Sequence, residues 1–531
     1  MVDVVSDQTE ISYAESVANW SGDTFSLDTE ILVQGGNSVS CIQTANGIND
    51  VIYTGGPWNM AGKHIRLYML SNITANMAVT NAIQIILDDG TNQATFTVFN
   101  SGSDYGGGWK DIFFDVDSTP LSGTVDTSAI TSVTLRINTS TKPRNAINGW
   151  YDNWRFGNGL EINSDAAEAI SFTDVATNDA LVANKYDILE NVDDVLFGKG
   201  KLTLGNAGGA KNCNLQSTNE QIVFIDRVVS ATLYGLVASE GTGITTIALT
   251  GLVCKTVGLS GAEIDFSTQV SNLGIAGSTF IGMGTMSFVL ASISTLIQAN
   301  GFTLCGATSI GSGMDFIGCS WTNCLAITAI GSITGGIVDG STASAAVVTA
   351  SLNLITGVAF SDSAGHAVEL TSIGAGSMSW DNTLDGYDAG VAASPVTPTS
   401  TGNEAIFVNV ASGTLTINVT DGASIPSIRS AGAIVNVVAG LKTFDFTLSP
   451  SITGYEWRIY TVTAVGSLVG AVEIAGEEVA TLDNQSISHN YASQPIAVQI
   501  LSGPYEEEIR YETLTAVDKS IVIDLTVDNN D

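Results

Sequence analysis

Large apolar residues recur at a nearly constant interval in the middle of the chain. Six of them, each among small residues and glycine, are 22, 19, 17, 22 and 24 residues apart, with a mean close to 21: Phe280, Phe302, Trp321, Val338, Phe360 and Leu384. Such an interval is typical of one turn of a parallel β-solenoid, in which three short strands make a turn and equivalent apolar residues stack inside. Residues 197–440 are therefore predicted to form a parallel β-helix of about ten turns, with Phe316 also inside it.

Composition agrees with a solenoid and excludes other classes of protein. Of the 531 residues, 44% are hydrophobic, 13% are charged and 56 are glycine, which argues against intrinsic disorder. Glycine, asparagine and aspartate supply the tight corners that a solenoid needs. The 18 basic and 53 acidic residues give a net charge of −35, and no lysine or arginine lies between Lys255 and Arg429. Nucleic-acid binding is excluded, because it needs clustered cations.

The first 158 residues have a different pattern. Short runs alternate apolar and polar residues between turn-forming residues, and five of the eight tryptophans lie here: Trp20, Trp58, Trp109, Trp150 and Trp154. Alternation with this punctuation predicts an antiparallel β-sandwich over residues 1–158. Trp20 and Trp154 are predicted to be core residues.

Three segments of this region resemble the jelly-roll carbohydrate-binding-module family: Trp20-Ser-Gly-Asp23, residues 58–67 and Gly149-Trp-Tyr-Asp-Asn-Trp-Arg-Phe156. In that family the first Asp of a Tyr-Asp-Asn signature often ligates a structural calcium. Tyr151-Asp152-Asn153 matches the signature, so the resemblance implies a calcium ligand at Asp152. Asp23, Asp115 and Asp117 are further candidate oxygen ligands. The alternative is that Asp152 accepts hydrogen bonds from nearby backbone.

Two tryptophans are candidate glycan-binding residues. Trp58 follows Gly55-Gly56-Pro57 and Trp109 follows Gly106-Gly107-Gly108, so both are predicted to lie in loops. An exposed indole can stack on a sugar ring, whereas a buried indole is simply a large core residue. Both possibilities stay open for Trp58 and Trp109.

A connector and a second sandwich complete the domain organisation. Residues 159–196 are predicted to be a helical cap, because Asn163-Ser-Asp-Ala-Ala-Glu168 is typical of a helix start and Tyr186, Leu189, Val192 and Leu196 recur every three to four residues. Residues 441–531 regain charge around alternating runs and are predicted to form a small β-sandwich. It resembles the Ig-like domains appended to phage virion proteins.

Three solenoid segments resemble the right-handed, pectate-lyase-like β-helices in structural proteins of tailed bacteriophages: Phe316–Cys324, Gly365–Leu370 and Glu404–Thr420. This resemblance implies a virion component on the outside of a particle, with other virion proteins as partners. Host-surface polysaccharide and a trimeric assembly are further expectations. No secretory signal or membrane-spanning run is found in the sequence.

Catalytic motifs are sparse. Ser361-Asp-Ser-Ala-Gly-His366 holds the residue types of a triad but falls at an expected corner. The densest acidic cluster, Asp381-Asn-Thr-Leu-Asp-Gly-Tyr-Asp388, could supply the two carboxylates of a glycosidase or be a turn-rich loop. The six cysteines are predicted to be small buried hydrophobic residues, and the three histidines allow no Cys/His zinc spacing.

The sequence thus predicts an all-β protein with a jelly roll, a right-handed parallel β-helix and a C-terminal Ig-like sandwich. The predicted function is a non-catalytic structural component of a phage virion, such as a head decoration, fibre or tail-spike-like protein, with glycan binding. No cofactor other than a structural calcium is predicted. The alternative is a polysaccharide depolymerase acting on host surface glycan.

Overall fold

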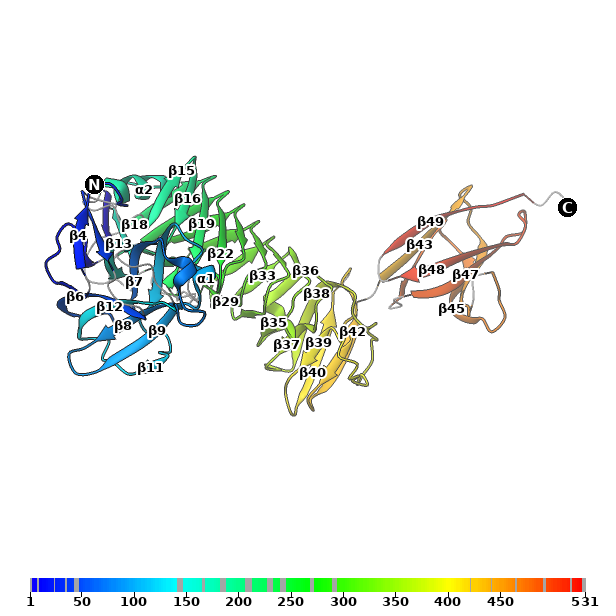
Figure 1. The fold of residues 1–531 in the computed structure, drawn as a ribbon. Coiled ribbons are helices and arrows are strands. Elements are labelled where there is room, and N and C mark those ends of the chain that lie inside the picture. Colours follow the sequence, from blue (N-terminus) through cyan, green and yellow to red (C-terminus); the bar gives the residue numbers. More distant parts are fainter. Residues whose placement is uncertain are drawn as a thin grey trace. The chain divides into compact units, whose positions relative to one another are not determined.

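The structure is a computed structural model that describes most of the chain (Figure 1). The described residues are 2–6, 9–22, 24–33, 36–42, 47–140, 147–164, 168–181, 188–205, 213–226, 233–238, 245–267, 272–288, 294–420, 422–440, 442–463, 466–489, 493–515 and 518–527. The chain divides into two units, residues 1–296 with 303–306, and residues 297–302 with 307–531. Among the described residues, no helix is long and apolar enough to cross a membrane.

The N-terminal part of the first unit is a sandwich of two antiparallel sheets. The first sheet contains β10 (Trp109–Asp115), β7 (His64–Ser71), β13 (Ile147–Gly157), β5 (Ser38–Ile42) and β4 (Thr24–Asp28), with β2 (Thr9–Ser12) paired to β13. The second contains β11 (Ser122–Gly123), β9 (Gln93–Phe99), β8 (Ile83–Asp88), β12 (Ile130–Asn138), β6 (Ile48–Trp58) and β3 (Trp20–Gly22). The predicted sandwich is therefore confirmed as a fold.

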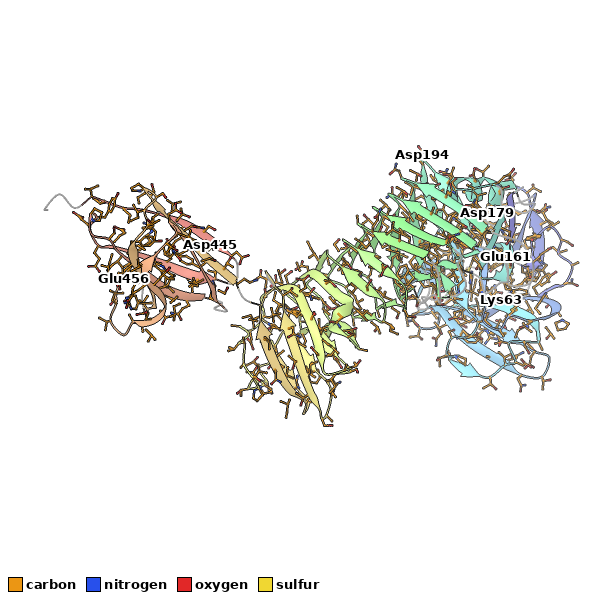
Figure 2. The ribbon with its side chains drawn as sticks, turned by 180° about the vertical axis from the view of Figure 1, so that it is seen from behind. Lys63, Glu161, Asp179, Asp194, Asp445 and Glu456 are labelled. Atoms are coloured by element: carbon orange, nitrogen blue, oxygen red, sulfur yellow. The ribbon has the colours of Figure 1, made fainter. Side chains whose placement is uncertain are left out.

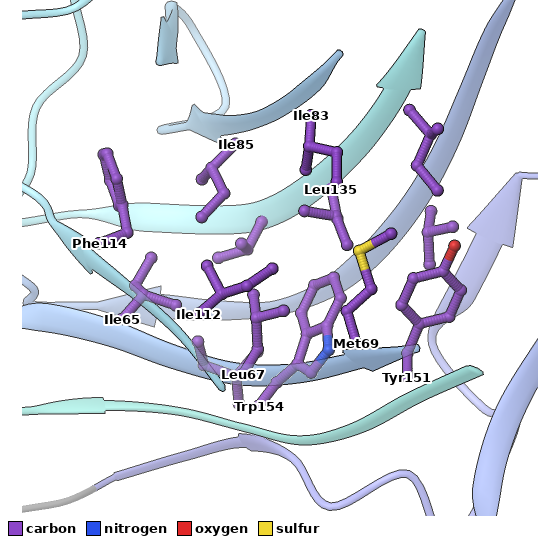
Figure 3. Packing of buried hydrophobic residues seen from close by; sticks show 14 of the residues in the cluster. Ile65, Leu67, Met69, Ile83, Ile85, Ile112, Phe114, Leu135, Tyr151 and Trp154 are labelled. Atoms are coloured by element: carbon purple, nitrogen blue, oxygen red, sulfur yellow. The ribbon is translucent and has the colours of Figure 1, made fainter. Parts of the chain in front are cut away.

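The sandwich core follows from the alternation along each strand. On β7, Ile65, Leu67 and Met69 point between the sheets and pack with residues of β8, β10 and β12 (Figure 3). Trp20 and Trp154 are buried there with ring centroids 5.0 Å apart, as predicted. Alternate side chains of the first sheet consequently face away from this core.

The chain start belongs to the solenoid and not to the sandwich. β1 (Val2–Ser6) pairs antiparallel with β14 (Gly159–Ser164), and β14 pairs parallel with β17 (Lys201–Leu204). The sandwich strands lie between β1 and β14 in sequence. The first described strand thus covers the edge that the first solenoid strand would otherwise expose.

The central region forms two long, largely parallel sheets, which confirms a β-helix-like fold. Within the described residues, the twelve-stranded sheet continues from β17 through β20 (Gly235–Ala238), β23 (Glu263–Asp265), β26 (Met286–Phe288), β29 (Thr308–Ile310), β32 (Ile327–Ala329), β35 (Ala345–Thr349), β37 (His366–Leu370) and β39 (Ile406–Val408) to β41 (Ile428–Ser430). The eighteen-stranded sheet contains the strands between these, from β15 (Leu189–Val192) to β42 (Ile434–Ala439). Most turns thus hold three short strands.

The strands of the larger sheet fall into two series. The first series is β18 (Cys213–Thr218), β21 (Thr245–Thr250), β24 (Asn272–Ala276), β27 (Ser294–Gln298), β30 (Asp315–Ile317) and β33 (Ser332–Thr334). The second is β19 (Gln221–Asp226), β22 (Val253–Gly258), β25 (Thr279–Ile281), β28 (Gly301–Thr303), β31 (Ser320–Thr322) and β34 (Ile337–Asp339). The longer β36 (Ile355–Ser361) pairs with both β33 and β34, and β38 (Ser377–Asp385) and β40 (Thr414–Val419) follow it.

The corners explain the Gly, Asn and Asp content of this region. One set of equivalent corners has φ between 53° and 68°, a left-handed conformation that glycine and asparagine adopt most readily: Asn219, Gly251, Gly277, Ala299, Gly318, Gly335 and Gly357. A second set has φ between 47° and 78°: Gly282, Leu304, Asn323, Gly340, Asp362 and Gly386. All of these residues except Gly357, which lies within β36, directly follow the end of a strand.

The predicted stack of apolar residues is confirmed. Trp321 pairs with Val338, Val338 with Phe360, and Phe360 with Leu384 on successive strands. Phe302 and Trp321 stack with centroids 5.2 Å apart. All five aromatic residues predicted inside are at most 1% exposed: Phe280, Phe302, Phe316, Trp321 and Phe360.

The segment predicted as a helical connector contains one helix flanked by strands. α2 (Phe172–Leu181) begins after Ser171, whose hydroxyl and backbone exchange hydrogen bonds with Asp174, and not at Asn163, which lies in β14. Leu189, Val192 and Leu196 lie in an antiparallel hairpin of β15 and β16 (Val195–Gly198). Its turn is Asp193-Asp194, both with positive φ, a conformation that fits the strand twist. Figure 2 labels Asp194. Tyr186 lies outside the described residues.

Two small sheets form the C-terminal part. One contains β46 (Asn484–His489), β43 (Lys442–Ser449) and β49 (Lys519–Asp524), and the other β45 (Val472–Ala480), β44 (Tyr455–Thr461), β47 (Ser493–Leu501) and β48 (Glu508–Thr515). The pairs are antiparallel apart from β43 with β49. Phe444, Phe446 and Trp457 belong to their shared core.

Candidate functional site

A row of side chains crosses the outer face of the first sandwich sheet. Strand register places Trp109 beside Leu70, Leu70 beside Trp150, and Trp150 beside Ser40. Ser26 of β4 is next to Ser40, and their hydroxyl oxygens are 2.8 Å apart. The row therefore combines two indoles, two strands apart, with hydroxyl groups.

The two indoles of this row are held differently. Trp109 is half-buried at the start of β10, directly after the glycine turn. Trp150 is 8% exposed, and its Nε1 donates a hydrogen bond of 2.8 Å to Asp28 Oδ2. That bond helps to lower the pKa of Asp28, after the larger effect of the Glu30 backbone amide. Trp150 is therefore buried and orients the charged Asp28 carboxylate, whereas Trp109 keeps part of its ring exposed.

Trp58 lies elsewhere. It is the last residue of β6 in the second sheet, is half-buried, and packs against the sandwich core. Its ring stacks on Tyr53 with centroids 6.3 Å apart and planes inclined by 23°. Trp58 and Trp109 therefore lie on different sheets and do not form one row. The glycine-proline flank that suggested a loop is part of an irregular strand end.

Asp152 is fully buried on the outer face of the first sheet. Register places it beside Tyr68, which is beside Asp111, and its Oδ2 accepts a 2.8 Å hydrogen bond from the Val33 amide. Asp115 lies four residues beyond Asp111 on β10, about 13 Å along the strand. Asp23 lies outside the described residues. Among the described residues, no group of three or more His, Cys, Asp or Glu could hold a metal ion.

Replacing Asp152 is expected to destabilise the protein without involving calcium. The substitution Asp152→Ala removes the buried carboxylate that accepts a hydrogen bond from the Val33 amide, which should cost about 1–3 kcal/mol. Thermal unfolding of the full chain should show this loss in both chelator and excess calcium, with equal midpoints for wild type. A midpoint that rises with calcium in wild type but not in Asp152→Ala would restore the metal site.

The rest of this outer face is buried and charged. Arg66 is fully buried and donates to both carboxylate oxygens of Asp111, at 2.8 and 2.5 Å. His64 is also fully buried, and its ring is nearly parallel to that of Tyr234, with centroids 6.3 Å apart. Tyr234 immediately precedes β20, so this end of the sheet face packs against the solenoid. The half-buried Trp109 lies at the opposite end of this face, beside Leu70.

On the solenoid, register forms a short ladder of polar groups. Asp339 of β34 pairs with Ser361 of β36, which pairs with Asp385 of β38. The Ser361 hydroxyl donates to Asp339 Oδ1 at 2.6 Å. Two strand spacings, about 9.6 Å, separate the backbones of Asp339 and Asp385. Two carboxylates thus lie on one face with a hydroxyl between them.

The other predicted catalytic groups have structural partners. Asp381 accepts a hydrogen bond from the Thr420 hydroxyl, and Asp388 accepts one from Thr401. His366 Nδ1 is 2.7 Å from the Glu404 carbonyl oxygen, whereas Ser361 bonds Asp339. Ser361 and His366 therefore do not form a triad.

Residues 386–405 leave the solenoid and return across its last strand. The Ala393 and Val437 backbones exchange hydrogen bonds of 3.0 and 2.9 Å, and the Val396 amide donates to Val435 at 2.9 Å. The predicted turn-rich loop is therefore present after Asp385. It covers β42, the final strand of the larger sheet, and so protects an edge that could pair with another chain.

The cysteines are buried residues of the core. All six are buried and none is part of a disulfide, as predicted. Burial raises the pKa of Cys254 and of Cys213 to about 12. These two thiols stay protonated near neutral pH, and the thiolate is the reactive form.

Comparisons with known proteins give no family. No known protein family and no curated protein matches the chain. Among solved structures, a family 11 carbohydrate-binding module from Clostridium thermocellum in complex with a mixed-linked tetrasaccharide is 17% identical, covers 29% of this chain and 96% of its own, and has a TM-score of 0.20. A family 22 xylan-binding domain is 11% identical, covers 28% of this chain and 92% of its own, and has a TM-score of 0.19. The catalytic domain of a GH87 α-1,3-glucanase in complex with nigerose is 9% identical, covers 82% of this chain and 97% of its own, and has a TM-score of 0.18. These values are too low to transfer an activity or a site residue.

Proposed function

We propose that this chain is a non-catalytic glycan-binding protein that uses the Trp109 row of its sandwich. The supporting observation is the in-register row of Trp109, Leu70 and Trp150, with the Asp28 carboxylate hydrogen-bonded to the second indole. The apolar face of a sugar ring stacks on an indole. A carboxylate accepts hydrogen bonds from sugar hydroxyls, and a serine hydroxyl can accept or donate them. A saccharide ring stacks on the exposed part of Trp109, and the half-buried Asp28 carboxylate accepts hydrogen bonds from saccharide hydroxyls.

The solenoid acts in this proposal as a spacer. Its parallel strands, buried aromatic stack and covered last strand support a structural role. We further propose that the chain is an external component of a tailed-phage virion, a decoration, fibre or tail-spike-like protein that contacts other virion proteins and host polysaccharide. Electron microscopy of phage particles labelled with an antibody to this chain tests that location, and unlabelled particles would contradict it.

Calorimetric titration of the full chain with neutral β-glucan oligosaccharides tests the binding site. Trp109→Ala is expected to weaken binding about tenfold, which corresponds to about 1.4 kcal/mol. The comparison variant Trp58→Ala, on the other sheet, should stay within about twofold of wild type. The opposite pattern would move the site to Trp58, and no binding by wild type across neutral glycans would end the proposal.

A second candidate function is glycoside hydrolysis, favoured by the Asp339–Ser361–Asp385 ladder. An inverting glycosidase holds its two carboxyl groups about 6.5–9.5 Å apart, with room for a water molecule. Two strand spacings, about 9.6 Å between backbones, lie at the upper limit of that range, and Asp339 leans towards Ser361, which lies between it and Asp385. Release of reducing ends that Asp339→Asn and Asp385→Asn abolish, and Asp388→Asn retains, would establish this function in place of the non-catalytic one.

A further inference from the structure

Arg429 is an isolated cation in a strongly acidic chain. The net charge is −35, and the preceding lysine or arginine in the sequence is Lys255. Other arginines of the chain, among them Arg66, Arg136, Arg458 and Arg510, form ion pairs with carboxylates. Among the described residues, no carboxylate pairs with Arg429. Its charge is therefore available to an outside anion.

The neighbours of Arg429 form a row on the twelve-stranded sheet. Glu369 of β37 pairs with Phe407 of β39, and Phe407 pairs with Arg429 of β41. All three side chains are half-buried, and register puts them on one face. The row therefore presents a carboxylate, an aromatic ring and a guanidinium group on adjacent strands.

Stacking holds the guanidinium in place. The Arg429 guanidinium carbon is 4.8 Å from the centre of the Phe407 ring. The His366 ring also packs against Phe407, with centroids 5.4 Å apart. His366 is held in place by a hydrogen bond between its Nδ1 and the Glu404 carbonyl oxygen. A stacked guanidinium keeps its planar fork of N–H donors free for two parallel hydrogen bonds. Among the described residues, β41 is the last strand of this sheet, and on its other side the loop residue Thr399 donates a backbone hydrogen bond of 3.1 Å to Ile428.

The acidic member of the row is already oriented. Asn409 Nδ2 donates a 2.8 Å hydrogen bond to Glu369 Oε1, and Asn409 itself is exposed. Glu369 does not neutralise Arg429, because Phe407 lies between them. Glu369 and Asn409 can accept and donate hydrogen bonds to hydroxyl groups, while Arg429 matches a carboxylate.

We propose that Arg429, Phe407, Glu369 and Asn409 form a binding site for a carboxylate-bearing saccharide, a uronic acid residue. The carboxylate of the sugar accepts two parallel hydrogen bonds from Arg429. The hydroxyl groups of the sugar form hydrogen bonds with Glu369 and Asn409. The acidic remainder of the chain repels anions elsewhere, which makes this cation a local and selective point of contact. The site lies on the solenoid and uses none of the residues of the Trp109 row, so this proposal is independent of the proposed neutral-glycan site.

Binding of glucuronate oligosaccharides to the full chain tests this site. Arg429→Gln is expected to weaken binding at least tenfold, and Arg429→Lys to recover only part of it, because lysine keeps the charge but not the fork. Arg458→Gln is the matched control, since it removes one positive charge from an arginine already paired with Glu456 and Glu473. Unchanged thermal midpoints for all variants show that folding is not the cause.

Three probes distinguish an acidic saccharide from a neutral saccharide and from a simple anion as the ligand. Glucuronate oligosaccharides should bind, whereas neutral glucose oligosaccharides should not bind at Arg429, and acetate should compete only weakly. Equal competition by acetate would reduce the site to a general anion site and overturn the saccharide proposal, as would equal binding by wild type and Arg429→Gln. Trp109→Ala should leave glucuronate binding unchanged, so this proposal and the Trp109 proposal fail independently.

Discussion

Acidification from pH 6.5 towards pH 3 is expected to destabilise the N-terminal unit through His64. This imidazole is fully buried, and neither ring nitrogen has a hydrogen-bond partner among the described residues. Its ring packs against those of Phe113, with centroids 5.3 Å apart, and Tyr234, which also contact each other. Burial lowers the pKa of His64, and the cations Arg66, Arg155 and Lys63 lower it further against the opposing effect of Asp111, to about 3. A proton on His64 would therefore be poorly tolerated in the folded state.

The sign of the effect follows from linkage. In the unfolded chain His64 has its ordinary pKa near 6.5, whereas in the folded chain it remains neutral down to about pH 3. Between these values the unfolded state binds more protons, so the free energy of unfolding falls as the pH falls. The slope approaches about 1.4 kcal/mol per pH unit, which amounts to about 4–5 kcal/mol over the window. Above pH 6.5 this histidine should contribute no pH dependence.

Unfolding of the full chain, followed from pH 7.5 to pH 4 by intrinsic tryptophan fluorescence, measures this loss. His64→Phe keeps a planar ring against Phe113 and Tyr234 but cannot take a proton, so the first unfolding transition of this variant should depend much less on pH. His489→Phe is the control, because His489 lies in the C-terminal sheets, where burial also lowers its pKa. An equally steep acid loss in His64→Phe would show that other groups cause it.

The features that the sequence predicted are those with a local cause. The 21-residue interval depends on one stacked position per turn, and the Gly, Asn and Asp content depends on corners that need positive φ, such as Asn323 and Gly340. Both can be read without knowing which strands pair. The hairpin at Asp193-Asp194 also had a local signal, but the spacing of Leu189, Val192 and Leu196 favoured a helix.

The features that the sequence did not predict depend on distant pairing. The Trp109 row needs the register of β10, β7 and β13, and Asp152 finds its donor in Val33, 119 residues earlier. The same holds for Glu369, Phe407 and Arg429, which are separated by long intervals in the chain and adjacent only after the solenoid forms. An isolated arginine in an acidic region was the one sequence signal that pointed to that site.

A large loss of stability is expected from a single solenoid substitution at Phe360. This residue is 1% exposed, its neighbours in register are Val338 and Leu384, and its ring is nearly parallel to that of Trp380, with centroids 6.3 Å apart. Phe360→Ala leaves a cavity between successive turns, because the parallel strands on both sides fix the spacing of the stack. The expected cost is about 3–5 kcal/mol.

Ile337→Ala provides the matched control for Phe360→Ala. Ile337 is an apolar residue of the neighbouring strand β34, but it is 49% exposed on the outer face, so its removal should cost less than about 0.5 kcal/mol. Denaturant unfolding monitored by far-ultraviolet circular dichroism compares both variants with wild type. Because each solenoid turn contacts mainly its neighbours, Phe360→Ala should lower the solenoid transition while the transition of the N-terminal sandwich stays in place. Equal midpoints for the two variants would mean that Phe360 is not part of a tightly packed stack, and the repeat would then describe strand spacing without the predicted core.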